Sequence, residues 1–169
     1  MRTTVVQRQG PITDAAAMLI KKLKSVRTVA IDTAVSLAAY QALKKALHGP
    51  LKTVSGVTAE FRTVKDATEI ARIEKAAALS AQALERTRSF FKPGISEIEL
   101  AGILDLEMCR LGCKPGFETI IAFGPNASRP HHQPGPRKLR QTDAILIDFG
   151  ARYDGYCADL TRCFVLGKP

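Results

Sequence analysis

The first sixty residues show two short apolar runs separated by a helical pattern. The segment 28–32 (TVAID) has the composition of a buried strand, and 51–56 (LKTVSG) predicts a second one. Between them, 36–47 (SLAAYQALKKAL) predicts a helix that ends before Gly49 and Pro50. The order strand–helix–strand favours α/β structure. Because a piece of this size buries little apolar surface, we expect the tail of a larger α/β domain.

Two amphipathic helices are predicted between residues 66 and 112. Asp66 with Glu69 forms the capping box of the first helix, and Ser96 with Glu99 forms that of the second. The first is expected to end at Lys92-Pro93-Gly94, and the second at Gly112. The apolar positions that predict the buried faces are Ile70, Ile73, Ala77, Leu84 and Phe91, followed by Ile98, Ala101, Leu104, Met108 and Leu111. Both helices are interpreted as packing elements without catalytic residues.

The last fifty residues are rich in strand patterns. The segment 117–123 predicts a strand, and 124–136 predicts a long loop that carries His131 and His132. The segments 144–153 and 155–167 predict a hairpin that turns at Asp154-Gly155. A charged residue, Asp148, interrupts the apolar run of the first hairpin strand, where an unpaired carboxylate is costly.

The hairpin register predicts that Asp148 and Asp159 share one face. With a two-residue turn at 154 and 155, Asp148 faces Thr161, and Asp159 is the diagonal neighbour of Asp148 at roughly 7–8 Å. Two carboxylates at this separation can hold two divalent cations between them. The spacing alone leaves open a structural role, with Asp148 capping a turn and Asp159 paired with Arg162.

The composition changes this picture little. A hydrophobic fraction of 46% supports a folded core, and no apolar run is long enough to span a membrane. The net charge of +9 is dispersed, and the chain has no Trp, so a solvated basic face is preferred over nucleic-acid binding. The absence of a signal-peptide pattern at the start favours a cytoplasmic protein. The four cysteines are expected to be reduced and mostly buried, because their spacing fits neither a zinc knuckle nor a redox motif.

Three motifs together resemble the pita-bread metallopeptidases, the family of Xaa-Pro aminopeptidases, prolidases, methionine aminopeptidases and creatinase. They are the Asn-Ala-Ser-x-Pro-His loop of FETIIAFGPNASRPHH, the Asp-Phe-Gly at 148–150, and Tyr-x-x-Asp-x-Thr-Arg at 156–162. The resemblance implies an α+β chain: residues 1–62 are the tail of a creatinase-like α/β domain, and residues 63–169 are the amino-terminal half of a pita-bread domain.

The resemblance also implies roles for three residues. Asp148 and Asp159 are expected to bind metal, with Asp159 bridging two divalent ions, and His131 to stabilise the tetrahedral intermediate. Manganese is the expected metal, with cobalt or zinc as alternatives. Cys157 stands where relatives often carry a small hydroxyl residue. The expected substrate is a peptide with an Xaa-Pro bond, cleaved by an aminopeptidase or a dipeptidase.

A departure from the family limits this expectation. Relatives complete the site with one more histidine and two glutamates from the second half of the fold, whereas the last glutamate here is Glu118. With three of five ligands missing, the chain alone is expected to be inactive, as a truncated product or as half of a split enzyme. A homodimer or a complementary chain is the expected protein partner. The alternatives are a non-catalytic binding or scaffold module of the same fold and, ranked last, a basic nucleic-acid binder.

Overall fold

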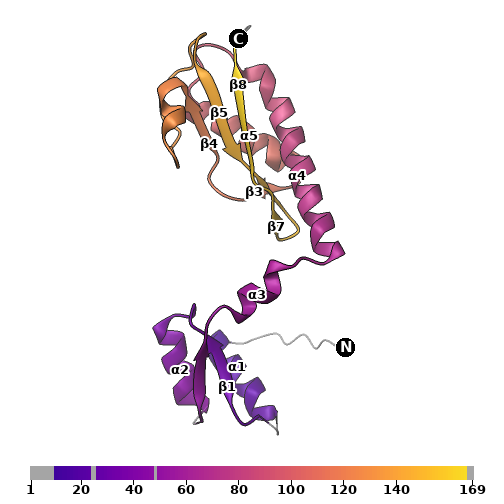
Figure 1. Ribbon diagram of the computed structural model, residues 1–169, viewed down its shortest axis with the longest axis vertical. Helices are drawn as coiled ribbons and strands as arrows, with labels where there is room; N and C mark the ends of the chain where they lie inside the picture. Colours follow the sequence, from indigo (N-terminus) through magenta and orange to yellow (C-terminus); the bar gives the residue numbers. More distant parts are fainter. Residues whose placement is uncertain (1–9, 24–25, 48, 167–169) are drawn as a thin grey trace. The chain divides into compact units, whose positions relative to one another are not determined.

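The structure is a computed structural model that describes residues 10–23, 26–47 and 49–166 (Figure 1). Helices and strands are mixed throughout these residues. The chain divides into two compact units, Met1–Val64 and Lys65–Pro169. The predicted boundary after residue 62 lies close to this division, but the assignment of each unit to a domain of the family stays a prediction. No helix in the described part of the chain is long and apolar enough to cross a membrane.

Unit 1 is a small α/β layer. It contains α1 (Ile12–Lys22), β1 (Val29–Asp32), α2 (Leu37–Leu47), β2 (Leu51–Val54) and α3 (Val57–Thr63). Strands β1 and β2 are parallel, with Val29 opposite Leu51, as a strand–helix–strand unit requires. The sequence interpretation gave no separate helix at 12–22 or at 57–63.

The packing of unit 1 is thin. Ala17 is the one buried apolar side chain among its described residues, whereas Phe61 and Val64 are both 81% exposed. A unit with so little buried apolar surface has little hydrophobic stabilisation of its own.

Unit 2 begins with two helices that start where the capping boxes predicted. In α4 (Ala67–Thr87), the Asp66 carboxylate accepts hydrogen bonds from the Thr68 and Glu69 amides, and the Glu69 carboxylate accepts one from the Asp66 amide. Ser96 and Glu99 cap α5 (Glu97–Arg110) in the same way. A 3₁₀ turn, η1 (Arg88–Phe90), follows α4, and Gly112 ends α5 in the left-handed conformation with φ of 80°.

The buried faces of both helices differ in part from the prediction. Ile70 is 47% exposed and Ile98 is 59% exposed, so neither belongs to the core. Hydrophobic periodicity alone misjudged them because it does not show which face of a helix the rest of the chain covers: Glu97, the neighbour of Ile98, is completely buried. The buried side chains are Ala76, Leu79, Ser80, Ala83, Leu84 and Thr87 in α4, and Glu97, Leu100, Ala101, Leu104, Glu107 and Met108 in α5.

Two small sheets carry the rest of unit 2. The first has the order β4 (Ile120–Phe123), β5 (Ala144–Phe149), β8 (Leu160–Val165), and the second has the order β3 (Lys114–Pro115), β6 (Ala151–Tyr153), β7 (Tyr156–Cys157). All pairs in both sheets are antiparallel. The predicted strand 117–123 ends as expected at Phe123 but begins only at Ile120, and a short 3₁₀ helix, η2 (Gly124–Ser128), opens the loop after it.

The predicted register of the hairpin is confirmed. Asp148 lies opposite Thr161, and Arg152 lies opposite Cys157. Asp154 and Gly155 both have positive φ, at 45° and 86°, as a two-residue type I′ turn requires. The hairpin is nevertheless not continuous, because it breaks at Gly150 and its two ends join different sheets.

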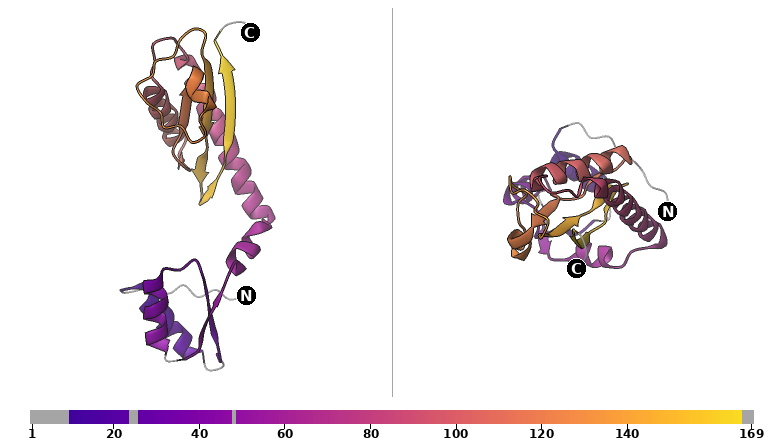
Figure 2. Two further views of the ribbon diagram at one scale, coloured as in Figure 1. Left: turned by 60° about the vertical axis from the view of Figure 1, so that its left-hand side comes forward. Right: turned by 90° about the horizontal axis from the view of Figure 1, so that it is seen from above.

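The core of unit 2 lies between the helices and the strands. Helices α4 and α5 pack on one side of the strands (Figure 2), and the buried cluster joins Leu100 and Leu104 of α5 to Ile121, Ile145 and Ile147 of the first sheet. The burial of this cluster fixes the sheet that carries Asp148. The cysteine prediction is half right: all four thiols are free, but Cys109, Cys157 and Cys163 are exposed and Cys113 alone of the four is buried.

Candidate metal centre

One cavity of unit 2 brings together the side chains singled out from the sequence. Its volume is about 350 Å³, and it is open to solvent. The lining residues are Phe117, Glu118, Ile120, His131, Gln133, Asp148 and Asp159. The two aspartates come from the hairpin, and His131 comes from the loop after η2. Residues up to 42 positions apart in the chain thus meet at one surface.

Asp148 lies on the central strand of the first sheet. Its neighbours across the two ladders are Ile120 on β4 and Thr161 on β8. Its Oδ1 atom is buried and has no hydrogen-bond partner, a condition shared by one other side-chain atom, Arg137 Nε, among the described residues. A buried carboxylate oxygen without a partner is costly. A cation in the cavity would satisfy it.

Around Gly150, the two stretches of backbone that carry Asp148 and Asp159 lie close together. A β-carbon added at Gly150 would lie 1.8 Å from the Ala158 carbonyl oxygen, so the two backbones approach each other as closely as glycine alone permits. Asp159 follows Ala158 immediately and precedes β8. The Asp-Phe-Gly motif therefore places the two carboxylates through its glycine as well as through its aspartate.

His131 is exposed and has a strained backbone. Its φ of 55° is positive, which is uncommon for a residue with a side chain. Such a conformation costs of order 1–3 kcal/mol and persists where the surroundings hold it. The residues on either side of His131 must therefore be anchored.

A buried carboxylate, Glu97, supplies that anchor. It is completely buried at the start of α5. Its Oε1 accepts hydrogen bonds from the Phe123 amide at 2.9 Å and from Asn126 Nδ2 at 2.8 Å. Its Oε2 lies 2.9 Å from His132 Nε2 and accepts from the Gly135 amide at 3.1 Å.

These contacts decide the charge of Glu97. Burial opposes ionisation, but the hydrogen bonds from Asn126, His132, Phe123 and Gly135 outweigh it and hold the pKa of Glu97 below its usual value. The sequence interpretation passed over Glu97 as part of a packing helix. An acidic residue in a first helical turn is ordinary, so no local signal marks it.

A second set of contacts fixes the start of the same loop. The Asp143 carboxylate accepts from Arg137 Nη2 at 3.1 Å and from the Arg140 amide at 3.1 Å. Gly124 has a φ of 51°, and a β-carbon there would lie 2.4 Å from Asp143 Oδ1. The loop therefore leaves β4 at Gly124, which packs against the Arg137–Asp143 ion pair too closely for a larger residue.

The donor set fits divalent cations but is small. Aspartate oxygens are hard ligands that suit manganese, magnesium and related ions. Within residues 10–23, 26–47 and 49–166, no group of three or more His, Cys, Asp or Glu side chains is arranged to hold a metal ion. Asp148 and Asp159 together supply part of a site.

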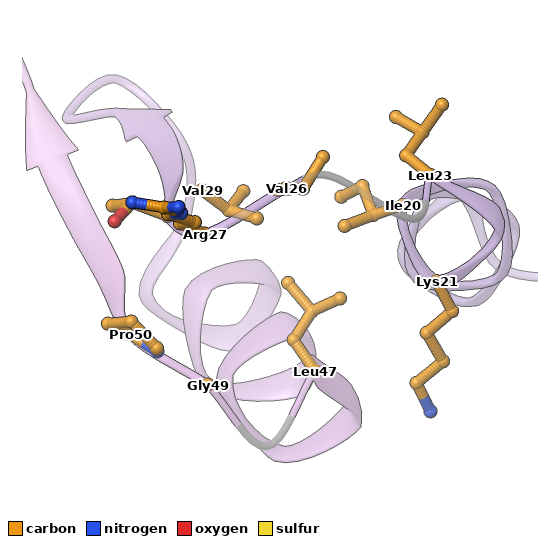
Figure 3. Close-up of a pocket in the computed structure, with 10 residues that line it drawn as sticks. Ile20, Lys21, Leu23, Val26, Arg27, Val29, Leu47, Gly49 and Pro50 are labelled. Carbon is orange, nitrogen blue, oxygen red and sulfur yellow. The ribbon is translucent and has the colours of Figure 1, made fainter.

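Another cavity, in unit 1, lacks this chemistry (Figure 3). Its volume is about 260 Å³. Ile20, Val29 and Leu47 point into it, while the Lys21 ammonium points away. The lining residues that the structure describes include no carboxylate, histidine or cysteine.

Comparison with known proteins decides the family. Residues 71–169, more than half of the chain, match metallopeptidase family M24. The chain belongs to this family. The resemblance drawn from the sequence motifs is therefore confirmed.

Individual relatives agree with this assignment. An uncharacterised peptidase of Staphylococcus epidermidis is 39% identical over 111 residues, which cover 65% of this chain and 32% of the relative. The structure of an Xaa-Pro dipeptidase from Bacillus anthracis is 32% identical and superposes with a TM-score of 0.88 over 97% of this chain and 46% of its own. An X-Pro aminopeptidase from Thermotoga maritima, 31% identical, gives a TM-score of 0.86 over 96% of this chain and 47% of its own.

These matches confirm the predicted fold class for this M24 chain. They also show that it spans about a third of the curated relative and just under half of each solved structure.

Proposed function

We propose that this M24 chain contributes the first part of a dinuclear metal site that hydrolyses Xaa-Pro peptide bonds. Asp148 and Asp159 are the metal ligands, and His131 is the catalytic residue that contacts the substrate. The remaining ligands, a histidine and two glutamates in the family pattern, come from sequence other than these 169 residues. The complete site is proposed to hold two divalent ions, with manganese as the first candidate.

One observation carries the proposal. The cavity that joins His131, Asp148 and Asp159 contains a buried carboxylate oxygen, Asp148 Oδ1, without any protein partner. A purely structural aspartate would be expected to meet a backbone amide or a cation of the protein there. The membership in a metallopeptidase family supports the same conclusion.

The chemistry follows from the side chains. A divalent metal pair, when bound, supplies a water of lowered pKa and polarises the substrate carbonyl. Asp148 and Asp159 hold and orient that pair through their hard oxygens. His131 lies at the exposed rim, where its imidazole can donate a hydrogen bond to a carbonyl oxygen as it gains negative charge. The apolar lining residues Phe117 and Ile120 suit the ring of a proline.

A non-catalytic binding module is the second candidate. It is favoured by the lack of a three-residue metal cluster among the described residues. Such a module has no need for Asp148 or Asp159 as ligands, so metal binding separates the two candidates.

The direct test is a titration of the chain with Mn²⁺. Binding is measured by electron paramagnetic resonance, as the loss of the signal of free Mn²⁺. Because two aspartates leave most coordination positions to water, the affinity of the chain is expected to be weak. Asp148→Asn and Asp159→Asn should each abolish saturable binding. Asp154→Asn is the matched control, because this aspartate lies in the same hairpin but pairs with Arg72 outside the cavity. Equal binding by all four proteins would refute the ligand assignment.

Hydrolysis is tested by complementation. The chain alone is expected to show no cleavage of Xaa-Pro dipeptides with added Mn²⁺. Mixing it with the second half of a close relative should produce activity, and the same mixture with Asp159→Asn should lack it. Robust metal-dependent hydrolysis by the chain alone would show that the five-ligand account is wrong.

A further inference from the structure

We propose that Glu97 is the positioning residue for His131, acting as a buried clasp that closes both ends of the loop 124–136. This inference rests on the proposed function, because it gives His131 its importance. Glu97 itself does not line the cavity. It acts on the site through the loop.

Each oxygen of the Glu97 carboxylate binds one end of the loop. Oε1 binds the incoming end, through the Phe123 amide and the Asn126 side chain. Oε2 binds the outgoing end, through His132 and the Gly135 amide. His131 lies between these two attachments with its positive φ. Release of either end of the loop would let the His131 backbone relax toward the commoner conformations with negative φ.

The backbone gives the clasp partial support. The Glu97 amide donates to the Arg137 carbonyl, and the Ile98 amide donates to the Gly135 carbonyl. These bonds hold the outgoing end against α5 without the Glu97 carboxylate. The incoming end, His132 and the Gly135 amide depend on the carboxylate, so they are the places where its loss is detected.

Asn126 and His132 gain specific roles from this arrangement. Asn126, the first residue of the Asn-Ala-Ser-x-Pro-His motif, ties the motif to α5 through Glu97. An ionised carboxylate can only accept hydrogen bonds, so His132 Nε2 must carry a proton. The two adjacent histidines therefore differ: His131 faces the cavity, and His132 faces the clasp.

Only a carboxylate side chain of this length can accept all four of these hydrogen bonds. Four donors converge on two oxygens, and the neutral amide of glutamine replaces one oxygen with a donor. Whichever way that amide is oriented, two donors would face its NH₂ group. Glu97→Gln thus keeps the size of the side chain and removes half of the clasp.

The first experiment uses the chain without metal. In wild type, the ¹⁵N shifts of the neutral His132 ring should show a protonated Nε2 and an unprotonated Nδ1. In Glu97→Gln this preference should be lost, and exchange of the Phe123 or Gly135 amide hydrogen should accelerate at least about tenfold, the factor equal to about 1.4 kcal/mol. Glu107→Gln is the matched control, a second buried carboxylate of α5 that pairs with Arg86 and Arg110.

The control separates the clasp from general loss of stability. Glu107→Gln should leave the His132 ring shifts and both loop amides unchanged. Unchanged His132 shifts and amide exchange in Glu97→Gln would overturn the proposal. If Glu97→Gln does not fold, His132→Phe and Asn126→Ala each remove one donor, and each should accelerate exchange at its own end of the loop. No effect in either would equally overturn it.

The second experiment reads the position of His131. With Mn²⁺ at the aspartates, paramagnetic broadening of the His131 ring signals should be strong in wild type and in Glu107→Gln, and several-fold weaker in Glu97→Gln. If Mn²⁺ broadens nothing near Asp148 and Asp159 in any variant, the proposed metal function fails, while the first experiment still decides the clasp. Equal broadening of His131 in Glu97→Gln and wild type would refute the positioning role alone.

Discussion

Substitution of Gly150 by alanine should be among the most damaging small changes in unit 2. The added β-carbon would lie 1.8 Å from the Ala158 carbonyl oxygen and 2.6 Å from its carbonyl carbon. Both atoms belong to the backbone, so no side chain can rotate away. The strands must separate by more than about 1 Å at this point to restore ordinary contact.

The cost follows from the size of that displacement. Inserting one extra carbon into a packed core typically costs about 1–3 kcal/mol, and more where the backbone itself must move. We therefore expect a loss of at least about 3 kcal/mol, from a total of roughly 5–15 kcal/mol for a domain. For a unit of this size, the melting temperature should fall by at least about 10 °C. Asp159, next to Ala158, would move with the strand, so Mn²⁺ binding should be lost as well.

The assay is thermal unfolding followed through amide signals of β5 and β8, which report on unit 2 alone. Gly102→Ala is the control, because Gly102 lies inside α5 with no atom within 4 Å of an added β-carbon. That variant should gain about 0.5–1 kcal/mol from the better helix propensity of alanine. The same substitution is thus expected to have opposite signs at the two positions.

A Gly150→Ala protein that melts within about 2 °C of wild type would refute the reasoning. So would a variant that loses stability but binds Mn²⁺ with unchanged affinity. The first result would deny the close approach of the strands. The second would show that this approach does not set the separation of the two aspartates.

Three further changes test other contacts of unit 2. Ser80→Ala should cost about 1–3 kcal/mol in urea unfolding, because the buried Ser80 hydroxyl accepts the hydrogen bond of the Ala151 amide, which would be left unpaired. Burial raises the pKa of Asp105, so the folded state favours its protonated form and loses that stability as pH rises through the raised pKa; Asp105→Asn should therefore be more stable than wild type near neutral pH and equal to it in acid. Asp66→Ala should lower stability by about 1 kcal/mol and increase amide exchange at Glu69, since the helix loses its capping box; unchanged exchange there would contradict the assignment.

Local rules sufficed for several elements. The capping boxes at Asp66 and Ser96 were readable because each joins residues only three apart. The Asp154-Gly155 turn fixed the hairpin register, since a two-residue loop leaves one pairing and the strand period of two assigns the faces. That register predicted that Asp148 and Asp159 share one face of the hairpin, and both residues line one cavity. The motif set also identified the M24 family.

The sequence did not reveal features that depend on distant partners. Glu97 looks like an ordinary first-turn acid, and its meaning comes from Gly135, 38 residues away in the chain. Ile70 and Ile98 are exposed, because the face of each helix that is buried is chosen by its tertiary neighbours, which helical periodicity does not encode. The hairpin breaks at Gly150 because its two ends pair in different sheets, which the local turn signal does not encode.

The sequence by itself determined the local caps, the turn, the hairpin register and the family, because each is set by residues close in the chain or by a fixed motif. Only the tertiary structure decided which polar groups are buried together. It left Asp148 Oδ1 without a protein partner and gathered four donors on Glu97. Burial is the physical reason, since a buried polar group must find a partner, and the partner is chosen by packing in space rather than by position along the chain.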